Sequence, residues 1–278
     1  MILVTGTKRS GTSMWMQILK GAGVSVIGDP FLAEWEESIR DANPHGFYES
    51  TLRQGIFYAT NPDPRTGSFL HPRDTRHHAV KVFIPGLIRT DFAFLHRVVA
   101  SMRDWRDYGP SLQRLYAMED EHLAKKGPAA VEMARKRRSK LPPHVEWLME
   151  NYDLIRDFSA RRFPIRLHTY ERLLEDPERI LTSVFGWLEI GDVAGGIAAI
   201  DPKVRTQRQG PVPEGVEPAH VEVFDAFHAT IHEEKPLPRT LIDRLNEVHH
   251  ELREAHGGLS RERGREEAED SSEAEAGP

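Results

Sequence analysis

The chain has 278 residues, of which 39% are hydrophobic, with a formal net charge of −6 and no cysteine. The lack of cysteine excludes disulfides, thiolate metal sites and cysteine nucleophiles, and the negative charge does not suggest general nucleic-acid binding. No stretch approaches the roughly 18 apolar residues of a membrane span, and the N-terminal "MILVTGTKRS" carries its cations behind its apolar run, unlike a signal peptide. We therefore expect a soluble, cytoplasmic protein.

Apolar runs of strand length alternate with helical patterns along the chain. In chain order we predict a strand at 1–5, a helix at 11–22, a short strand at 24–27, a short helix at 31–42, strands at 78–84 and 96–102, helices at 110–125, 128–139 and 144–161, a strand at 162–170 and a helix at 175–188. This alternation indicates βαβ units. The predicted fold is a P-loop-like, three-layer α/β domain with a central parallel sheet and helices on both faces.

The predicted domain covers residues 1–256 and includes a helical insert at 113–160. The remaining stretch, 257–278, is rich in charge and lacks apolar periodicity, so we expect a disordered acidic tail there.

The stretch "VTGTKRSGTS" (4–13) joins the first strand to the first helix. Gly6 and Gly11 have the spacing of a phosphate-binding loop, but a nucleotide triphosphatase has Lys directly after the second Gly. Here Thr12 follows, and the cations lie inside the loop, at Lys8 and Arg9. Backbone N–H groups at a helix start bind anions, so we interpret the loop as an anion cradle, the alternative being an ordinary βα turn with a Ser/Thr cap. The missing Lys argues against a Mg²⁺-dependent triphosphatase and favours a phosphate chain that ends early.

A second candidate anion site follows the strand at 96–102. In "MRDWRDYGPSLQRL" (102–115), Arg103 stands where the strand gives way to a loop, and Ser111 is expected near the start of the next helix. Parallel sheets bind ligands at the carboxyl ends of their strands. The alternative is a surface ion pair of Arg103 with Asp104 or Asp107.

Four motifs in order resemble the sulfotransferase family that uses 3′-phosphoadenosine 5′-phosphosulfate (PAPS) as its donor. They are "RSGTS" (9–13), the pair Arg103 and Ser111, "TYERLLEDPERILTSVFGWLEI" (169–190) and "RQG" (208–210). The resemblance implies that the 5′-phosphosulfate is held by the loop residues Lys8, Arg9, Ser10, Gly11, Thr12 and Ser13. It further implies that the 3′-phosphate is held by Arg103, Ser111, Arg208 and Gly210, and that Tyr170 lies near the adenine. The family uses no metal at the anhydride, and the His pairs at 77–78 and 249–250 are weak metal candidates, so we expect no metal site.

The general base departs from the pattern of animal cytosolic sulfotransferases, which place a His in a "K-T-H-L-P" segment. "KVFIP" (81–85) has Phe83 there. By its resemblance to a bacterial "N-P-x-G-(aromatic)₂-E" stretch, "NPHGFYES" (43–50) makes Glu49 the first candidate for the base, because burial can tune a carboxylate for this task. The other candidates are His45, then Asp29 and Glu34.

Three further residues are candidates by the same resemblance. Lys81 is a candidate to assist at the sulfuryl group. Arg9, with Lys8, is a candidate to contact the leaving group. Trp15 stands one residue beyond a family Trp that stacks on adenine.

The predicted activity is sulfuryl transfer from PAPS to a hydroxyl or amine of a small-molecule or glycan acceptor. Two alternatives stay open. One is a P-loop kinase-like enzyme, for which Asp104 is the best metal carboxylate, and the other is a non-catalytic nucleotide-binding relative. The basic stretch "ARKRRSK" (134–140) is interpreted as a solvated helix face, with a lip for an acidic acceptor as the alternative. Nothing in the pattern specifies the acceptor or an oligomeric state.

Overall fold

A parallel sheet forms the centre of the protein, in a computed structural model that describes residues 1–31, 40–201 and 210–273. The described residues form one five-stranded sheet with the order β2-β3-β1-β4-β5, in which all neighbouring strands are parallel. Its strands are β1 (Ile2–Thr5), β2 (Ser25–Ile27), β3 (His78–Lys81), β4 (Arg97–Met102) and β5 (Ile165–Thr169). The predicted α/β class with a central parallel sheet is confirmed.

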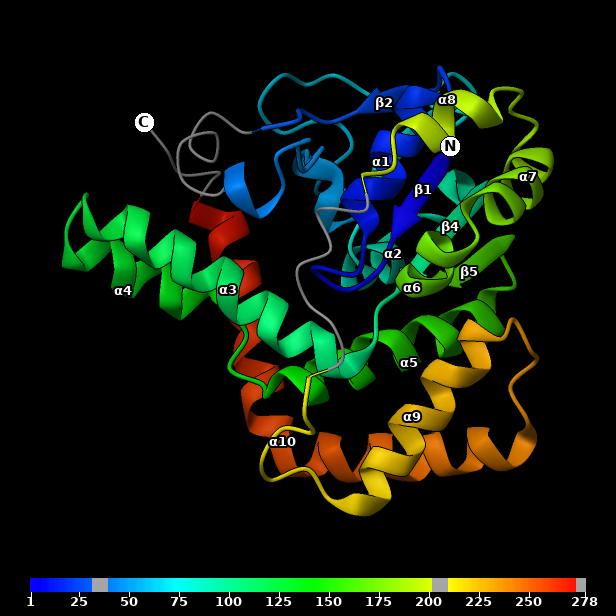
Figure 1. Ribbon diagram of the computed structural model, residues 1–278. Coiled ribbons are helices and arrows are strands. Elements are labelled where there is room, and N and C mark those ends of the chain that lie inside the picture. The colour runs from blue at the N-terminus through cyan, green and yellow to red at the C-terminus, as the bar shows by residue number, and fades with distance from the viewer. Residues whose placement is uncertain (32–39, 202–209, 274–278) are drawn as a thin grey trace.

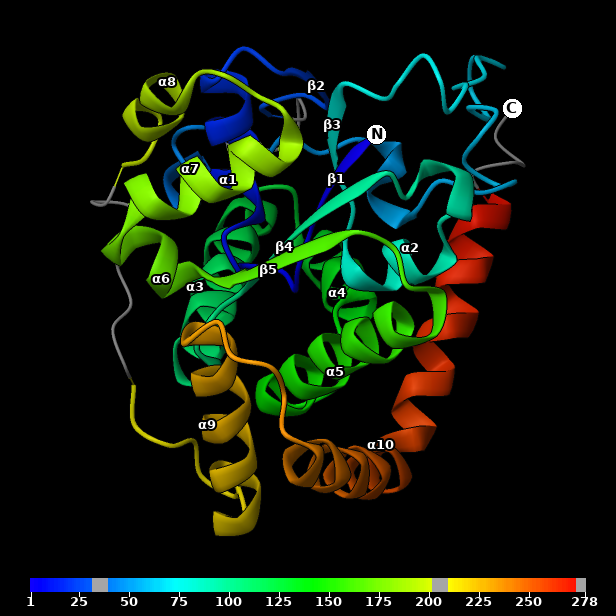
Figure 2. The same ribbon diagram turned by 90° about the vertical axis from the view of Figure 1, so that its right-hand side faces the viewer.

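Helices cover both faces of the sheet (Figures 1 and 2). They are α1 (Thr12–Gly21), α2 (Ile84–Arg89), α3 (Trp105–Ala124), α4 (Pro128–Arg137), α5 (Pro143–Arg161), α6 (Tyr170–Glu175), α7 (Pro177–Leu188), α8 (Val193–Ala198), α9 (Pro218–His232) and α10 (Arg239–Glu273). Short 3₁₀ turns occur at Arg40–Ala42, Thr51–Gln54 and Phe92–Phe94. In Figure 2, α1, α7 and α8 lie on one side of the strands, and α2 and α5 lie on the other.

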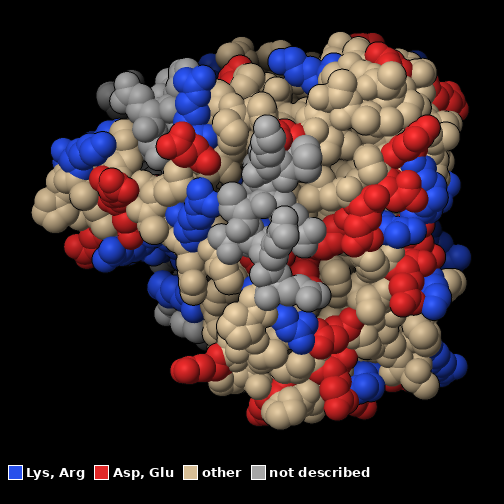
Figure 3. Space-filling view, viewed as in Figure 1, with Lys and Arg blue, Asp and Glu red and all other residues tan. Residues whose placement is uncertain are grey.

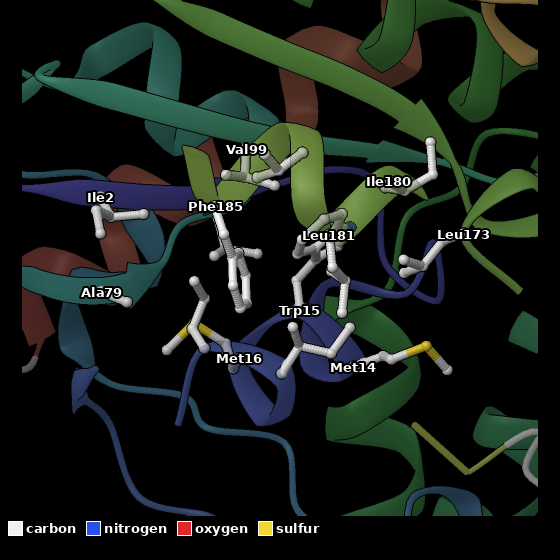
Figure 4. Close-up of a cluster of buried hydrophobic side chains, with 14 of the residues drawn as sticks. Ile2, Met14, Trp15, Met16, Ala79, Val99, Leu173, Ile180, Leu181 and Phe185 are labelled. Carbon is white, nitrogen blue, oxygen red and sulfur yellow. The ribbon is translucent and has the colours of Figure 1, made fainter. Parts of the chain in front are cut away.

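Alternation along the strands divides the core into two layers, because successive strand side chains point to opposite faces. In β1, Ile2 and Val4 join the cluster under α1 and α7, whereas Leu3 joins the cluster under α2 and α5. Figure 4 shows the first cluster, which includes Trp15, Met16 and Leu181. Trp15 is fully buried there.

A third cluster lies beyond the β4–β5 edge, where α3, α5, α9 and α10 pack together around aromatic residues such as Trp147 and Phe224. The predicted insert at 113–160 comprises most of α3 together with α4 and α5. Helices α3 and α4 extend to the left of the sheet in Figure 1, as a lobe attached at the end of β4. None of the described helices is long and apolar enough to cross a bilayer.

Several element boundaries differ from those predicted. Helix α3 begins at Trp105, because Asp104 caps it, and Pro110 lies inside the helix rather than at its start. Helix α10 extends to Glu273, so its last turns fall within the stretch predicted as a disordered tail, and that prediction itself stays untested. The domain boundaries themselves stay a prediction. Most of the helix predicted at 31–42 lies outside the described residues.

Candidate functional site

The loop after β1 has a backbone that only glycine accommodates well at Gly11. This residue has φ = 97°, and a Cβ built on it would lie 2.6 Å from Cδ2 of Tyr170. Two hydroxyl bonds fix the loop: Ser10 Oγ donates to the Thr7 carbonyl at 2.7 Å, and Ser101 Oγ of β4 donates to the Ser10 carbonyl at 2.5 Å. The loop therefore lies against β4 on one side and the Tyr170 ring on the other.

Arg9 and Arg103 converge on one hydroxyl. Arg9 Nε donates to Ser111 Oγ at 3.2 Å, and Arg103 Nη1 donates to the same oxygen at 3.2 Å. Arg103 Nη1 also donates to the Arg9 carbonyl at 3.2 Å, and its guanidinium lies 5.2 Å from the centre of the Tyr170 ring. The parallel register places Val4 beside Val99, so these residues meet because the loops after β1 and β4 leave the same edge of the sheet.

The two guanidinium groups form a concentration of positive charge. Within the described parts of the chain, neither has a carboxylate partner, and the Nε of Arg103 is buried without a hydrogen-bond acceptor. Burial, together with the nearby Arg103 and Arg114, lowers the pKa of Arg9 to about 10. Buried cations are normally paired, so an uncompensated pair indicates a site for an external anion.

A different arrangement lies at the end of β3. Lys81 Nζ donates to Glu49 Oε1 at 3.0 Å and to the Phe47 carbonyl at 2.5 Å, and it lies 3.4 Å from Ser13 Oγ. The second Glu49 oxygen, Oε2, accepts from Arg53 Nη1 at 3.0 Å. The backbone of Glu49 is held by Asp29, whose N–H donates to its carbonyl at 3.1 Å.

Burial affects the pKa of Lys81. Lys81 is 2% exposed, and burial lowers its pKa, an effect that Glu49 partly offsets. The Phe83 ring lies 5.5 Å from Lys81 Nζ. Glu49, Lys81 and Arg53 thus form a compact ionic cluster beside an aromatic wall.

One cavity of about 700 Å³ joins the two arrangements. Its lining includes Arg9, Gly11, Thr12, Ser13, Arg103 and Tyr170 at one end, and Glu49, Arg53, Lys81, Phe83 and Pro85 at the other. A further wall comes from two helices and the residues that follow them. It contains Leu115, Tyr116, Glu119, His122 and Leu123 from α3, Lys126 from the turn after α3, Ala130, Met133 and Ala134 from α4, and Arg138 directly after α4. Lys8 also lines the cavity.

The structure brings most of the predicted anion-binding residues together, but their contacts and positions in the site differ. The hydroxyl of Ser10 is used inside the loop, whereas Thr12 and Ser13 face the cavity. Ser111 lies in the second turn of α3 rather than at the helix start. Gly210 lies beside the start of α3, where a Cβ would be 3.3 Å from the Arg106 carbonyl oxygen. Arg208 lies outside the described residues.

The candidates for the base are separated by the fold. Glu49 lines the cavity, whereas His45 is not part of its lining and pairs with Asp201 at 3.1 Å. Asp29 meets Glu49 through its backbone only, and its side chain is not part of the cavity lining. Glu34 lies outside the described residues. The buried position of Trp15 in the core excludes the adenine-stacking part suggested by the resemblance.

The alternative reading of Arg103 as part of a surface ion pair does not hold. Arg103 is 6% exposed and bonds to Arg9 and Ser111, while Asp104 Oδ1 accepts from the Arg106 N–H at 2.8 Å as the cap of α3. Two arginines of the basic stretch at 134–140 pair with carboxylates of α3. Arg135 bonds Asp120 at 3.0 Å, and Arg138 bonds Glu119 at 2.6 Å. Basic and acidic side chains lie next to one another on the α3–α4 lobe at the left of Figure 3.

Three residues of the site were missed by sequence reasoning. Arg53 follows Glu49 at i+4, a spacing that could have indicated the pair. Ser101 carries no sequence signal, because its bond to the loop depends on strand order. Glu171 follows Tyr170 directly and bonds the Asp104 N–H at 3.3 Å, which the sequence does not reveal. In the described part of the chain, no group of three or more His, Asp or Glu residues has the arrangement of a metal site.

Comparisons with known proteins give limited information. No family model matches the chain, and no curated protein matches it. A crystal structure of a sulfotransferase from Alicyclobacillus acidocaldarius aligns over 90% of this chain and 95% of its own, at 13% sequence identity and a TM-score of 0.37. Likeness at this level carries no argument about activity, which must come from the residues of the cavity.

Proposed function

We propose that the protein is a sulfotransferase that moves a sulfuryl group from PAPS to an acceptor hydroxyl or amine. The observation that carries the proposal is the pair of a half-buried Arg9 and a buried Arg103, two guanidinium groups that share Ser111 Oγ and lack a carboxylate partner within the described residues. Such a pair suits a ligand with two separate anionic groups. In the proposed complex, Arg9 and the glycine loop bind the 5′-phosphosulfate, and Arg103 with Ser111 binds the 3′-phosphate.

The same geometry disfavours the kinase-like alternative. A P-loop kinase uses a Lys after the second glycine and a carboxylate that holds Mg²⁺. Thr12 occupies the first position, and the best carboxylate, Asp104, is used as the cap of α3 and does not line the cavity. A donor that requires only cationic and backbone contacts fits these residues better.

The ionic cluster around Glu49 is the proposed acceptor end. In the proposed step, Glu49 takes the proton of the acceptor hydroxyl, the acceptor oxygen forms a bond to sulfur, and the bond from sulfur to the bridging oxygen breaks. The products are the sulfated acceptor and adenosine 3′,5′-bisphosphate. A carboxylate has about four lone-pair sites, so the bonds from Lys81 and Arg53 leave acceptor capacity on Glu49.

The wall beyond Glu49 supports an acceptor with an apolar body. Leu115 and Leu123 of α3 and Met133 of α4 face the cavity, and Phe83 lies on the side of Lys81. Ion pairs neutralise much of the charge in this wall, as in the contact of Arg138 with Glu119. We propose an alcohol, phenol or amine on an apolar frame, rather than a glycan, as the acceptor.

Calorimetric titration with adenosine 3′,5′-bisphosphate, with and without EDTA, tests the donor assignment. We expect binding that EDTA does not change, and much weaker binding of adenosine 5′-phosphate. ATP binding that needs Mg²⁺, without bisphosphate binding, would show that the kinase-like alternative is correct.

Turnover of PAPS with a series of 4-alkylphenols and a set of glycosides tests the acceptor assignment. We expect kcat/KM to rise with alkyl length, by about fourfold for each buried methylene. Bisphosphate binding without turnover of any acceptor would favour the non-catalytic alternative.

A further inference from the structure

The carboxylate of Glu171 lies behind the anion site rather than in it. It is 6% exposed, and its two oxygens have different partners. Oε1 accepts from the Asp104 N–H at 3.3 Å, and Oε2 lies 3.2 Å from Nε2 of His228 on α9. A buried carboxylate with both oxygens committed holds the groups around it in one arrangement, because breaking either bond leaves buried charge unsatisfied.

The neighbours of these two contacts connect Glu171 to the ligand. Asp104 directly follows Arg103, and Glu171 directly follows Tyr170, whose ring lies 5.2 Å from the Arg103 guanidinium and against Gly11. One side chain therefore ties the loop after β4 to the start of α6 after β5. The Arg103 carbonyl is held from the other side, by Trp147 Nε1 at 2.7 Å.

Helix α9 supplies the remaining support. Besides His228, its Asp225 accepts from Trp105 Nε1 at 2.8 Å and from the guanidinium of Arg106. Burial alone would raise the pKa of Glu171, but the bonds from His228 and from backbone N–H groups outweigh it and lower that pKa, so Glu171 is an anion. His232 stacks on His228 at 6.0 Å and contacts Glu175 at 3.3 Å.

We infer that Glu171 is a positioning residue, which with His228 fixes Arg103 and Tyr170 in the geometry that recognises the 3′-phosphate. The inference rests on the proposed function, because it assumes that Arg103 binds that phosphate. Glu171 does not line the cavity, so it acts through the Asp104 backbone and not by contact with the ligand.

The test is the ratio of two dissociation constants, that of adenosine 5′-phosphate over that of adenosine 3′,5′-bisphosphate. The ratio reports recognition of the 3′-phosphate alone, whereas a general loss of structure weakens both ligands together. We expect Glu171→Ala to lower the ratio about tenfold, which corresponds to about 1.4 kcal/mol. Glu171→Gln keeps an oxygen for the Asp104 N–H, and its ratio should stay within about twofold of the wild type.

The chain offers a matched control in Glu175, one turn along α6. It pairs with His232, one turn along α9, but it is half exposed and has no bond to Asp104. Glu175→Ala should leave the ratio unchanged. If Glu171→Ala does not fold, as judged by thermal unfolding, His228→Asn takes its place, with an expected fall of about threefold.

The outcomes separate the inference from the proposed function. An unchanged ratio in the variants, against a wild type that prefers the bisphosphate, overturns the positioning role and leaves the proposed function intact. An equal fall for Glu175→Ala also overturns it. A wild type with no preference for the bisphosphate overturns the proposed function, and the positioning role with it.

Discussion

The two ends of the cavity differ in whether their cationic side chains have carboxylate partners. At the end proposed to bind the nucleotide, the half-buried Arg9 and the buried Arg103 lie side by side, and neither has a carboxylate partner among the described residues. At the acceptor end, Lys81 and Arg53 each bond to an oxygen of Glu49. The first end is incomplete without an anion, whereas the second is complete by itself. This contrast indicates where the charged donor and the less charged acceptor should bind.

The contrast also bears on stability. Like charges in a buried site destabilise the folded state until a ligand arrives, and ligand binding then stabilises it. Removing one member of a buried ion pair, in contrast, strongly lowers the free energy of unfolding, because the other charge is left buried without a partner. Substitutions at the Glu49 end should therefore mainly lower the free energy of unfolding. Substitutions at the Arg9 and Arg103 end should mainly weaken ligand binding.

The largest effect is expected at the acceptor end. Glu49→Gln keeps the size of the side chain but leaves Lys81 as a buried cation without its carboxylate, so the free energy of unfolding should fall by about 3–5 kcal/mol. Urea denaturation measures this loss. The double variant Glu49→Gln/Lys81→Met should recover most of it. If the Glu49→Gln variant is as stable as the wild type, Glu49 does not stabilise the buried charge of Lys81, and the contrast between the two ends fails.

The next effect is expected at the nucleotide end, and in binding rather than in folding. Arg103→Gln removes one of two repelling cations, so the free energy of unfolding should change by less than about 1 kcal/mol. The affinity for adenosine 3′,5′-bisphosphate should fall about 100-fold, since a charged partner of a buried phosphate is lost. Calorimetry with the bisphosphate and with adenosine 5′-phosphate checks that the loss is confined to the 3′-phosphate.

The smallest effect concerns the loop that carries Arg9. Gly11→Ala requires a left-handed backbone and places a methyl group against Tyr170, so it should destabilise the protein by about 1–2 kcal/mol. Gly186→Ala in α7 is the control: a Cβ there meets nothing within 4 Å, and the added methyl should stabilise the helix by about 0.5–1 kcal/mol. Equal effects of the two substitutions on urea denaturation would show that the loop is not constrained by Tyr170.

Local patterns predicted the parts of the fold that depend on neighbours in sequence. The five strands and five of the ten α-helices in the described residues, namely α1, α3, α4, α5 and α7, were predicted from apolar runs, and the glycine loop from its position after the first strand. Helices α2, α6, α8, α9 and α10 were not predicted. The start of α3 was predicted at residue 110, whereas the Asp104 cap and the burial of Trp105 set the helix five residues earlier. Tertiary burial outweighed the local preference.

The pairing of side chains across the site could not be predicted in the same way. Glu49 and Lys81 are 32 positions apart, and they meet because the Asp29–Glu49 bridge holds the segment between the first two 3₁₀ turns at the end of β2, which pairs with β3. His45 belongs to the same stretch as Glu49, yet it does not line the cavity and pairs with Asp201, a residue of the lining. Residue type and spacing indicated the chemistry, while strand order decided which residues share the cavity.

Helix α3 gives the cavity a fixed length. It carries Ser111 beside Arg9 and Arg103 and Leu123 on the opposite wall of the cavity, so both proposed subsites draw on one continuous helix. Twelve residues of α-helix span about 18 Å, and one inserted residue would turn all later side chains by about 100°. For the proposed function, the helix would therefore set the distance between donor and acceptor, and we expect a change in its length to be more harmful than a change of a lining side chain.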